Sequence, residues 1–251
     1  MCTKINSLRQ QIPSTGIMLT SWLEALGFNR SELTDYVESG WLERLSTGVY
    51  RFAGDVPSLL GILASYGSQS NLKYHIGGAT ALELKGFSHY VSMGKPKAMV
   101  YAPVRPSLPK WIADADLDMQ LVSVSTGIFG EYGIEQVDYQ GMPIMVSSPE
   151  RAIMECLSLV PKHYNLMDVF YLFEMLTSLR SSVVQQLLES CSSVKVKRLF
   201  LYMAEKSRHR WYHKLDTSRI SLGSGIRSFE KGGVRISGYD IIIPKELADY
   251  E

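Results

Sequence analysis

The sequence predicts an α+β protein, and two observations support this class. Helical segments precede two short strands in the first 55 residues, whereas strand-like runs come first after residue 97 and helices follow them. Strands and helices that do not alternate regularly favour α+β over a doubly wound sheet. GKPK at 94–97 combines Gly, Pro and two cations and is the best linker in the chain. We therefore expect an N-terminal domain at 1–93, with its core at 1–55, and a mixed α+β C-terminal domain at 96–251.

The N-terminal core is predicted from its helix ends and turns. A first helix runs to Gln11 and is closed by Pro13, and a second helix, SWLEALG, has Gly27 directly after its end. Ser31 is expected to cap a third helix that Gly40 terminates. Two strands, WLERL and VYRF, follow, with the hairpin signal Ser-Thr-Gly between them. Helix, helix, turn, helix and hairpin is the order of a winged helix-turn-helix.

A module of this kind is expected to bind DNA with the start of its third helix and with its wing. The side chains expected to contact DNA on these two elements are Arg30, Ser31, Thr34, Arg44, Thr47 and Arg51. Residues 1–55 hold five Lys/Arg and six Asp/Glu, however, and the third helix carries Glu32, Asp35 and Glu38. Two interpretations remain open: the acids face away from DNA, or the module contacts protein instead.

The centre of the chain is predicted to contain further helices and strands. Helices are expected at 57–68, 79–85 and within 108–116, and strands at 89–93, 98–104, 119–125, 134–140 and 142–148. Gly141 suggests a tight hairpin between the last two strands. Ser148 should cap the next helix, with Pro149 at its first position and Glu150 favouring the positive end of the helix dipole. Helices then continue to Ser207, and a final strand spans 234–243.

Residues 194–235 form the most basic segment. They contain eleven Lys/Arg and three Asp/Glu, a net charge of +8 in a chain whose total is +1. Aromatic residues lie among these cations, a combination that suits a polyanion such as nucleic acid; a solvated face balanced by acids elsewhere is the alternative. A helical projection places Lys195, Arg198, Tyr202 and Lys206 together, which predicts a solvent-facing basic ridge. The expected phosphate-binding residues are Lys195, Lys197, Arg198, Lys206, Arg208, Arg210, Lys214, Arg227 and Lys231.

The sequence offers no convincing catalytic or metal site. His209 and His213 have the spacing of metal ligands, but HRWYH lacks the glutamate of HExxH, so we interpret both as polar surface side chains. Glu83 and Lys85 match the ExK pattern of some nucleases, and exposure on an amphipathic helix is the favoured interpretation. We expect no enzyme activity and no cofactor. Widely spaced cysteines, a polar start and no membrane-length apolar run predict a cytoplasmic protein with reduced thiols.

Four stretches together resemble one known family. They are the winged-helix pattern, YHIGGATALELKGFSHYV at 74–91, SSPERAIMECL at 147–157 and the basic stretch at 194–233. This combination resembles the AbiEi family, the antitoxin and transcriptional-regulator components of bacterial type IV toxin–antitoxin systems. The resemblance covers nearly the whole chain, and the basic stretch is its most specific part.

The resemblance implies two activities in a bacterial cytosolic protein. The protein would repress its own operon by binding inverted repeats in promoter DNA. Its C-terminal domain would counter a nucleotidyltransferase-like toxin, typically without a stable complex. The alternative is a protein- or RNA-interaction module that uses the basic segment, with the winged helix as a dimerisation scaffold.

Overall fold

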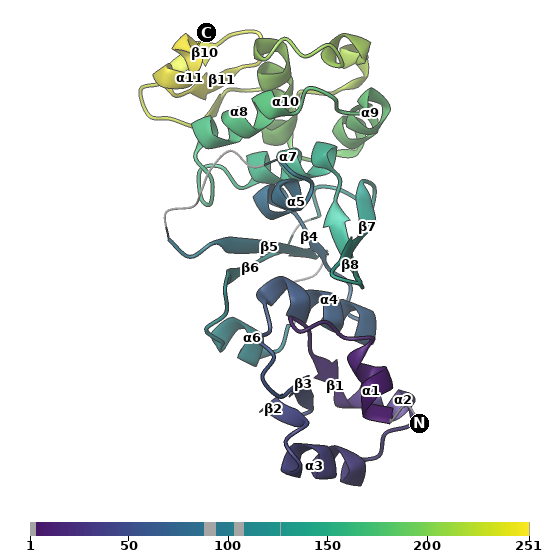
Figure 1. Ribbon diagram of the computed structural model, residues 1–251. Helices are drawn as coiled ribbons and strands as arrows, with labels where there is room; N and C mark the ends of the chain where they lie inside the picture. The colour runs from purple at the N-terminus through teal and green to yellow at the C-terminus, as the bar shows by residue number, and fades with distance from the viewer. Residues whose placement is uncertain (1–3, 88–93, 103–107, 126, 251) are drawn as a thin grey trace. The chain divides into compact units, whose positions relative to one another are not determined.

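The computed structural model of the protein describes residues 4–87, 94–102, 108–125 and 127–250 (Figure 1). These residues form helices and three β-sheets, which confirms the α+β class. The chain divides into two compact units: the first comprises Met1–Ile76, Ser92–Ser125 and Gln136–Val146, and the second Gly77–Val91, Thr126–Glu135 and Ser147–Glu251. Neither unit is one continuous stretch of sequence. The single boundary expected between residues 93 and 96 stays a prediction.

Residues 4–52 of the first unit form a helical module with a three-stranded sheet. Its elements are α1 (Lys4–Arg9), β1 (Met18–Leu19), α2 (Thr20–Ala25), α3 (Arg30–Glu38), β2 (Leu42–Ser46) and β3 (Val49–Phe52). Strand β3 lies in the middle of the sheet and pairs antiparallel with both β1 and β2. Leu23 of α2, Leu33 of α3 and Leu42 of β2 are buried in its core. The module therefore holds α3 and the β2–β3 hairpin on a common apolar centre.

The first helix, expected to run to Gln11, ends at Arg9. The ends of α2 and α3 follow the predicted turn chemistry, with one correction. Gly27 and Gly40 follow α2 and α3 with φ angles of 86° and 76°, a conformation that favours glycine. Helix α3 begins earlier than expected, because Asn29 and not Ser31 is its cap. Asn29 Oδ1 accepts the N–H of Glu32 at 2.8 Å, and the Glu32 carboxylate accepts the N–H of Asn29 at 2.7 Å. This reciprocal capping box fixes the start of α3.

A five-stranded sheet with the order β6-β5-β4-β8-β7 lies largely in the first unit. Its strands and the nearby helices are α4 (Leu59–Gln69), β4 (His75–Ile76), β5 (Lys97–Ala102), α6 (Lys110–Asp114), β6 (Gln120–Ser125), β7 (Ile134–Tyr139) and β8 (Met142–Ser147). Strand β4 pairs antiparallel with β5 and parallel with β8, and β5 pairs parallel with β6. Gln140 and Gly141, with φ of 54° and 86°, form the tight turn predicted between β7 and β8. The strand predicted at 89–93 lies outside the described residues.

The second unit is mostly helical, with a small sheet near the C-terminus (Figure 1). Its elements are α5 (Gly78–Leu84), α7 (Pro149–Ser158), α8 (Leu166–Met175), α9 (Ser181–Ser190), α10 (Val194–Lys206), the 3₁₀ turns η1 (Tyr212–Lys214) and η2 (Thr217–Arg219), β9 (Arg227–Ser228), β10 (Val234–Ile236), β11 (Ile241–Ile243) and α11 (Lys245–Asp249). Helix α7 contacts α5, α8, α9 and α10. Ser148 caps α7 and Pro149 is its first residue, which confirms the predicted helix start.

The final strand predicted at 234–243 is instead two strands. Residues 237–240 form a turn, in which Asp240 has φ of 49°, and β10 and β11 pair antiparallel across it. Strand β11 is central and pairs parallel with β9 on its other side. Ile241 and Ile243 are buried. The apolar run III therefore supplies the buried strand of the sheet, while the polar residues before it allow the chain to reverse.

Helix α7 is held by a buried ion pair. The Arg151 and Glu155 side chains are 3% and 0% exposed, and their nearest charged atoms are 2.8 Å apart. Glu155 Oε2 also accepts the N–H of Gly78 at 3.0 Å and the hydroxyl of Ser147 at 2.8 Å. Arg151 Nη1 donates to backbone carbonyls at residues 130 and 132. The pair thus joins α7 to the start of α5 and to the end of β8.

Replacement of Glu155 by alanine should lower the free energy of unfolding by roughly 3–5 kcal/mol, because the Arg151 charge would stay buried without its counterion. Urea unfolding followed by circular dichroism measures the change. Glu131→Ala, at an exposed position in the same unit, is the control and should stay within about 0.5 kcal/mol of the wild type. Equal unfolding midpoints for the two variants would contradict a stabilising role for the buried pair.

Candidate nucleic-acid interface

The start of helix α3 presents three of the side chains predicted to contact DNA. Arg30, Ser31 and Thr34 are exposed, and the Arg30 side chain keeps 85% of its surface accessible. They lie on one side of the helix, because positions i, i+1 and i+4 fall within about 100° of one another. Thr34 Oγ1 donates to the Arg30 carbonyl at 3.0 Å, and Arg30 Nε pairs with Glu24 at 3.0 Å. The three side chains are thus accessible, and their contact with DNA stays a prediction.

The acids of α3 divide between the helix cap and the exposed side. Glu32 belongs to the capping box, and its carboxylate also accepts from Lys4 Nζ at 2.9 Å. The hydrogen bond from the Asn29 backbone, followed by that from Lys4, lowers the pKa of the Glu32 carboxyl. Asp35 and Glu38 are exposed and project to the same side of the helix as position 34. The negative charge of Glu32 is therefore balanced by Lys4 within the module, whereas the charges of Asp35 and Glu38 remain beside the predicted contacts.

The hairpin of β2 and β3 carries the other three predicted contacts. Thr47 is exposed in the turn, where the following residue, Gly48, has φ of 75°. Arg44 is exposed, with its guanidinium carbon 5.5 Å from the centre of the Tyr50 ring and Nη2 3.2 Å from the Tyr50 hydroxyl. Arg51 is partly buried and pairs with Glu43 at 2.6 Å. Thr47 and Arg44 are thus available to a ligand, while the charge of Arg51 is locally balanced.

Trp41 is an exposed aromatic side chain that the sequence reasoning leaves out of the site. It directly precedes β2, keeps 53% of its surface accessible, and accepts the N–H of Ala53 at its carbonyl at 3.0 Å. Alternation along WLERL is the signal that could have identified it, because Trp41 falls on the opposite side of the strand from buried Leu42. Its indole is a further candidate contact beside the hairpin.

The basic ridge predicted on α10 faces the interior of the second unit, so that prediction is wrong. Lys197 and Arg198 are 8% and 2% exposed. Nine consecutive residues of the helix, 196–204, are buried. The apolar stripe formed by Val196, Leu199, Phe200 and Met203 is buried, and the opposite side of the helix is covered as well. Helix α10 is therefore a core helix that has its cations inside.

Lys195 and Lys206, at the two ends of α10, donate to backbone carbonyls. Lys195 Nζ is half-buried and reaches the carbonyls of Ser158, at 2.9 Å, and Val160, at the end of α7. Lys206 Nζ donates to carbonyls in the C-terminal residues 248–250. Helix ends and turns leave carbonyls without intrahelical donors, and a lysine can supply the missing donor. Both lysines are thus engaged by the fold, contrary to the expectation of an outward phosphate-binding face.

Arg198 is buried and hydrogen-bonded to backbone carbonyls. Its Nε donates to the carbonyl of Leu222 at 2.8 Å and its Nη2 to that of Gly223 at 3.2 Å. Its Nη1 donates to the carbonyls of Gly225 at 2.5 Å and Asp240 at 3.1 Å. No carboxylate of the described residues forms an ion pair with it. Four carbonyl dipoles therefore replace water around this charge, and they tie the Gly-rich turn at 222–225 to α10.

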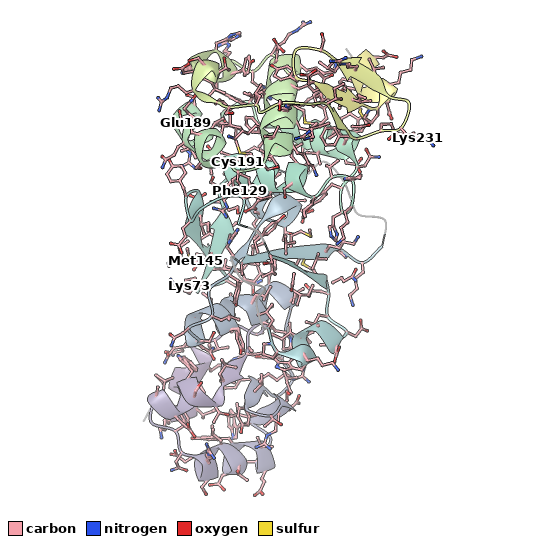
Figure 2. All side chains as sticks on the ribbon, turned by 180° about the vertical axis from the view of Figure 1, so that it is seen from behind. Lys73, Phe129, Met145, Glu189, Cys191 and Lys231 are labelled. Atoms are coloured by element: carbon pink, nitrogen blue, oxygen red, sulfur yellow. The ribbon has the colours of Figure 1, made fainter. Side chains whose placement is uncertain are left out.

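The other five cations predicted to bind phosphate are accessible. They are exposed, and none of them forms an ion pair with another described residue: Arg208, Arg210, Lys214, Arg227 and Lys231. Figure 2 shows Lys231 at the periphery of the C-terminal sheet. Arg219 and Arg235 differ, because they pair with Glu189 and Asp240 at 3.0 and 2.8 Å. The accessible positive charge of the basic segment is thus carried mainly by residues outside α10.

The two histidines of HRWYH have different environments. His213 is exposed, but His209 is 6% exposed, so its interpretation as a surface side chain is wrong. His209 Nε2 lies 2.9 Å from the Phe173 carbonyl, and its ring stacks on Trp211 with centroids 5.4 Å apart. Among the described residues, no group of three or more His, Cys, Asp or Glu side chains is placed to hold a metal ion. None of the helices in the described residues has the length and apolar character needed to cross a membrane.

The two residues of the ExK pattern, Glu83 and Lys85, have different surroundings. Glu83 is exposed, although partial burial raises the pKa of its carboxyl. Lys85 Nζ pairs with Glu135 at 2.8 Å. Lys85 therefore joins the end of α5 to the start of β7.

Replacement of Arg198 by methionine should lower the free energy of unfolding by at least about 3 kcal/mol, because four backbone carbonyls would lose the charged donor that they share. The unfolding midpoint in urea measures this change. Arg227→Met, at an exposed position of the same segment, should change it by no more than about 0.5 kcal/mol. If both variants unfold at the wild-type midpoint, Arg198 does not hold the Gly-rich turn.

Two family models match the chain. Residues 1–93 match the model described as "Transcriptional regulator, AbiEi antitoxin N-terminal domain". Residues 95–244 match the model described as "Transcriptional regulator, AbiEi antitoxin, Type IV TA system". The crystal structure of the RV2827C protein from Mycobacterium tuberculosis is similar in fold, with a TM-score of 0.65 and 14% identity over 95% of this chain and 89% of that chain. No match is found among curated proteins. The chain therefore belongs to the AbiEi family of antitoxin transcriptional regulators of type IV toxin–antitoxin systems.

Proposed function

We propose that the protein is an antitoxin and an autoregulatory repressor that binds inverted repeats in its own promoter. The observation that carries DNA binding is the exposed start of α3 beside the β2–β3 hairpin, in a module with the element order of a winged helix-turn-helix. In that arrangement α3 is the recognition helix, and its first residues reach base edges in the major groove. The family membership supports the role of transcriptional regulator.

The side chains of the module have distinct proposed roles. Arg30 is suited to guanine and Thr34 to several bases, because guanidinium and hydroxyl groups form those contacts in the major groove. Arg30 exchanges Glu24 for DNA at low cost, since exposed ion pairs contribute little. Arg44 and Thr47 contact the adjacent backbone from the hairpin. Arg51 contributes less, because Glu43 balances its charge.

The accessible cations of the C-terminal segment hold phosphates without reading sequence. They are Arg208, Arg210, Lys214, Arg227 and Lys231, and they supply the attraction that residues 1–55, with five cations and six acids, lack. In the proposed function, this half of the chain also counters a nucleotidyltransferase-like toxin without a stable complex. The protein acts in the cytoplasm, and no catalytic step or cofactor enters the proposal.

One observation favours a second candidate function, an interaction module for protein or RNA. Asp35 and Glu38 are exposed on the side of α3 that would enter the groove, where carboxylates repel phosphates. In this alternative α3 contacts a protein and the basic segment binds an acidic protein or RNA. Assays of promoter binding and of toxin neutralisation distinguish the two functions. A protein that neutralises the toxin but does not bind its promoter would favour the alternative.

The salt dependence of promoter binding tests the proposed repressor. If about six phosphates are neutralised, the logarithm of the association constant should fall with the logarithm of salt concentration with a slope of about −5. Fluorescence anisotropy on a promoter fragment with inverted repeats, at several salt concentrations, measures this slope. A slope near zero would contradict the proposal, because it would mean that no phosphates are neutralised on binding.

Two variants separate base reading from phosphate binding in the same assay. Arg210→Ala should weaken binding to the promoter and to random duplex equally, with a slope smaller in magnitude by about one. Thr34→Ala should instead reduce the preference for the promoter over random duplex, because it removes a contact proposed to reach bases.

A further inference from the structure

The Gly-rich turn at residues 222–225 directs three carbonyls to its inner side. The carbonyls of Leu222, Gly223 and Gly225 accept hydrogen bonds from the buried guanidinium of Arg198. In a trans peptide unit the N–H group points opposite to the C=O group. The N–H groups of residues 223, 224 and 226 therefore point away from Arg198.

These three N–H groups are free to bind a ligand. Gly223, Ser224 and Ile226 are exposed, and Ile226 keeps 46% of its surface accessible. No described residue accepts a hydrogen bond from the three N–H groups, whereas the next one, of Arg227, donates to the Asp240 carbonyl at 2.9 Å. The turn therefore has satisfied acceptors inside and unused donors outside.

Two glycines of the turn have positive φ angles, a conformation that favours glycine. Gly223 has φ of 59°, and a Cβ there would lie 2.9 Å from Val194 Cγ2. Gly225 has φ of 78°, and a Cβ there would lie 3.5 Å from Arg227 Nη1. The Arg227 guanidinium thus lies close to Gly225, and its Nη1 donates to the Ile226 carbonyl at 3.4 Å. A side chain at either position would strain the backbone, and at position 223 it would also clash with Val194.

The charge around the turn is positive. Arg198 donates to the carbonyls of the turn, the Arg227 guanidinium lies close to Gly225 and Ile226, and neither arginine forms an ion pair with a described carboxylate. Asp240, whose backbone reaches Arg198, has its carboxylate paired with Arg235 at 2.8 Å. Since the peptide dipoles have their positive ends outward, they add to the attraction for an anion.

We propose that this turn binds phosphate groups of a nucleic-acid backbone through the N–H groups of residues 223, 224 and 226 and the guanidinium of Arg227. Backbone N–H groups and arginine are common phosphate ligands and carry no sequence information. Because the three carbonyls converge on Arg198, the N–H groups diverge from one another. They therefore suit successive phosphate oxygens along a strand better than one enclosed ion. This site rests on the proposed nucleic-acid binding, and its ligand is the backbone phosphate.

Amide chemical shifts of the full-length protein, labelled with ¹⁵N and ²H, test this site. A random-sequence DNA duplex, inorganic phosphate and sodium chloride are added separately, with phosphate concentration and ionic strength matched. The amide protons of Gly223, Ser224 and Ile226 should shift downfield with duplex, less with inorganic phosphate, and not with chloride. An equal shift with inorganic phosphate would support the phosphate site and overturn a polynucleotide as its ligand.

A matched pair of variants measures the contribution of Arg227. Arg227→Ala and Lys245→Ala each remove one exposed positive charge from the second unit. Arg227→Ala should weaken duplex binding about threefold to tenfold for any sequence and reduce the salt slope by about one. Lys245→Ala should change the affinity less than about twofold.

The outcomes distinguish this site from the proposed repressor. If the promoter binds while the three amides stay unmoved and the two variants behave alike, the turn is not a phosphate site and the repressor proposal stands. If the promoter does not bind while the three amides respond to phosphate, the site stands and the repressor proposal fails.

Discussion

The second unit depends on one buried positive charge, the guanidinium of Arg198. A buried charge needs a counterion or fixed dipoles in place of its water, and here four backbone carbonyls supply the dipoles. Three of them belong to the Gly-rich turn and the fourth to the turn before β11. One side chain of α10 therefore fixes both turns beside the small C-terminal sheet. The same hydrogen bonds orient the N–H groups of the Gly-rich turn outward. The buried charge of Arg198 therefore determines which backbone donors face a ligand.

Charged side chains elsewhere divide in the same way between the fold and the surface. Lys195 and Lys206 satisfy carbonyls, and Lys4 balances the Glu32 carboxylate of the α3 capping box. Among the described residues, no carboxylate forms an ion pair with the five exposed cations Arg208, Arg210, Lys214, Arg227 and Lys231, whereas Arg219 and Arg235 pair with Glu189 and Asp240. The net charge of +8 in this segment is therefore larger than the positive charge that is accessible to a polyanion. Nucleic-acid binding, as proposed, depends on fewer cations and on backbone donors that a count of charges does not include.

Local signals predict the elements of this fold because neighbouring residues determine caps and turns. Ser148 caps α7, Gly27 follows α2, and Gly141 forms a hairpin turn, all as the sequence predicts. The environment of α10 is not predictable in this way. Its apolar stripe indicates one buried side, but the acceptors that bury Arg198 lie 24 to 42 residues further along the chain. His209 is misjudged for the same reason, since its carbonyl partner lies 36 residues away. The exposed start of α3 is the part of the candidate site that local pattern identifies best.

Amine-reactive labelling of the folded protein, read by mass spectrometry, tests most directly whether the basic segment has interior and exterior cations. We expect Lys214 and Lys231 to react about as fast as in the unfolded chain. Lys195, Lys197 and Lys206 should react more slowly, because Lys197 is buried and the ammonium groups of Lys195 and Lys206 are partly buried and hydrogen-bonded to backbone carbonyls. Duplex DNA should slow the reaction of Lys214 and Lys231. Equal labelling of all five lysines in the folded protein would contradict the division between structural and ligand-binding charge.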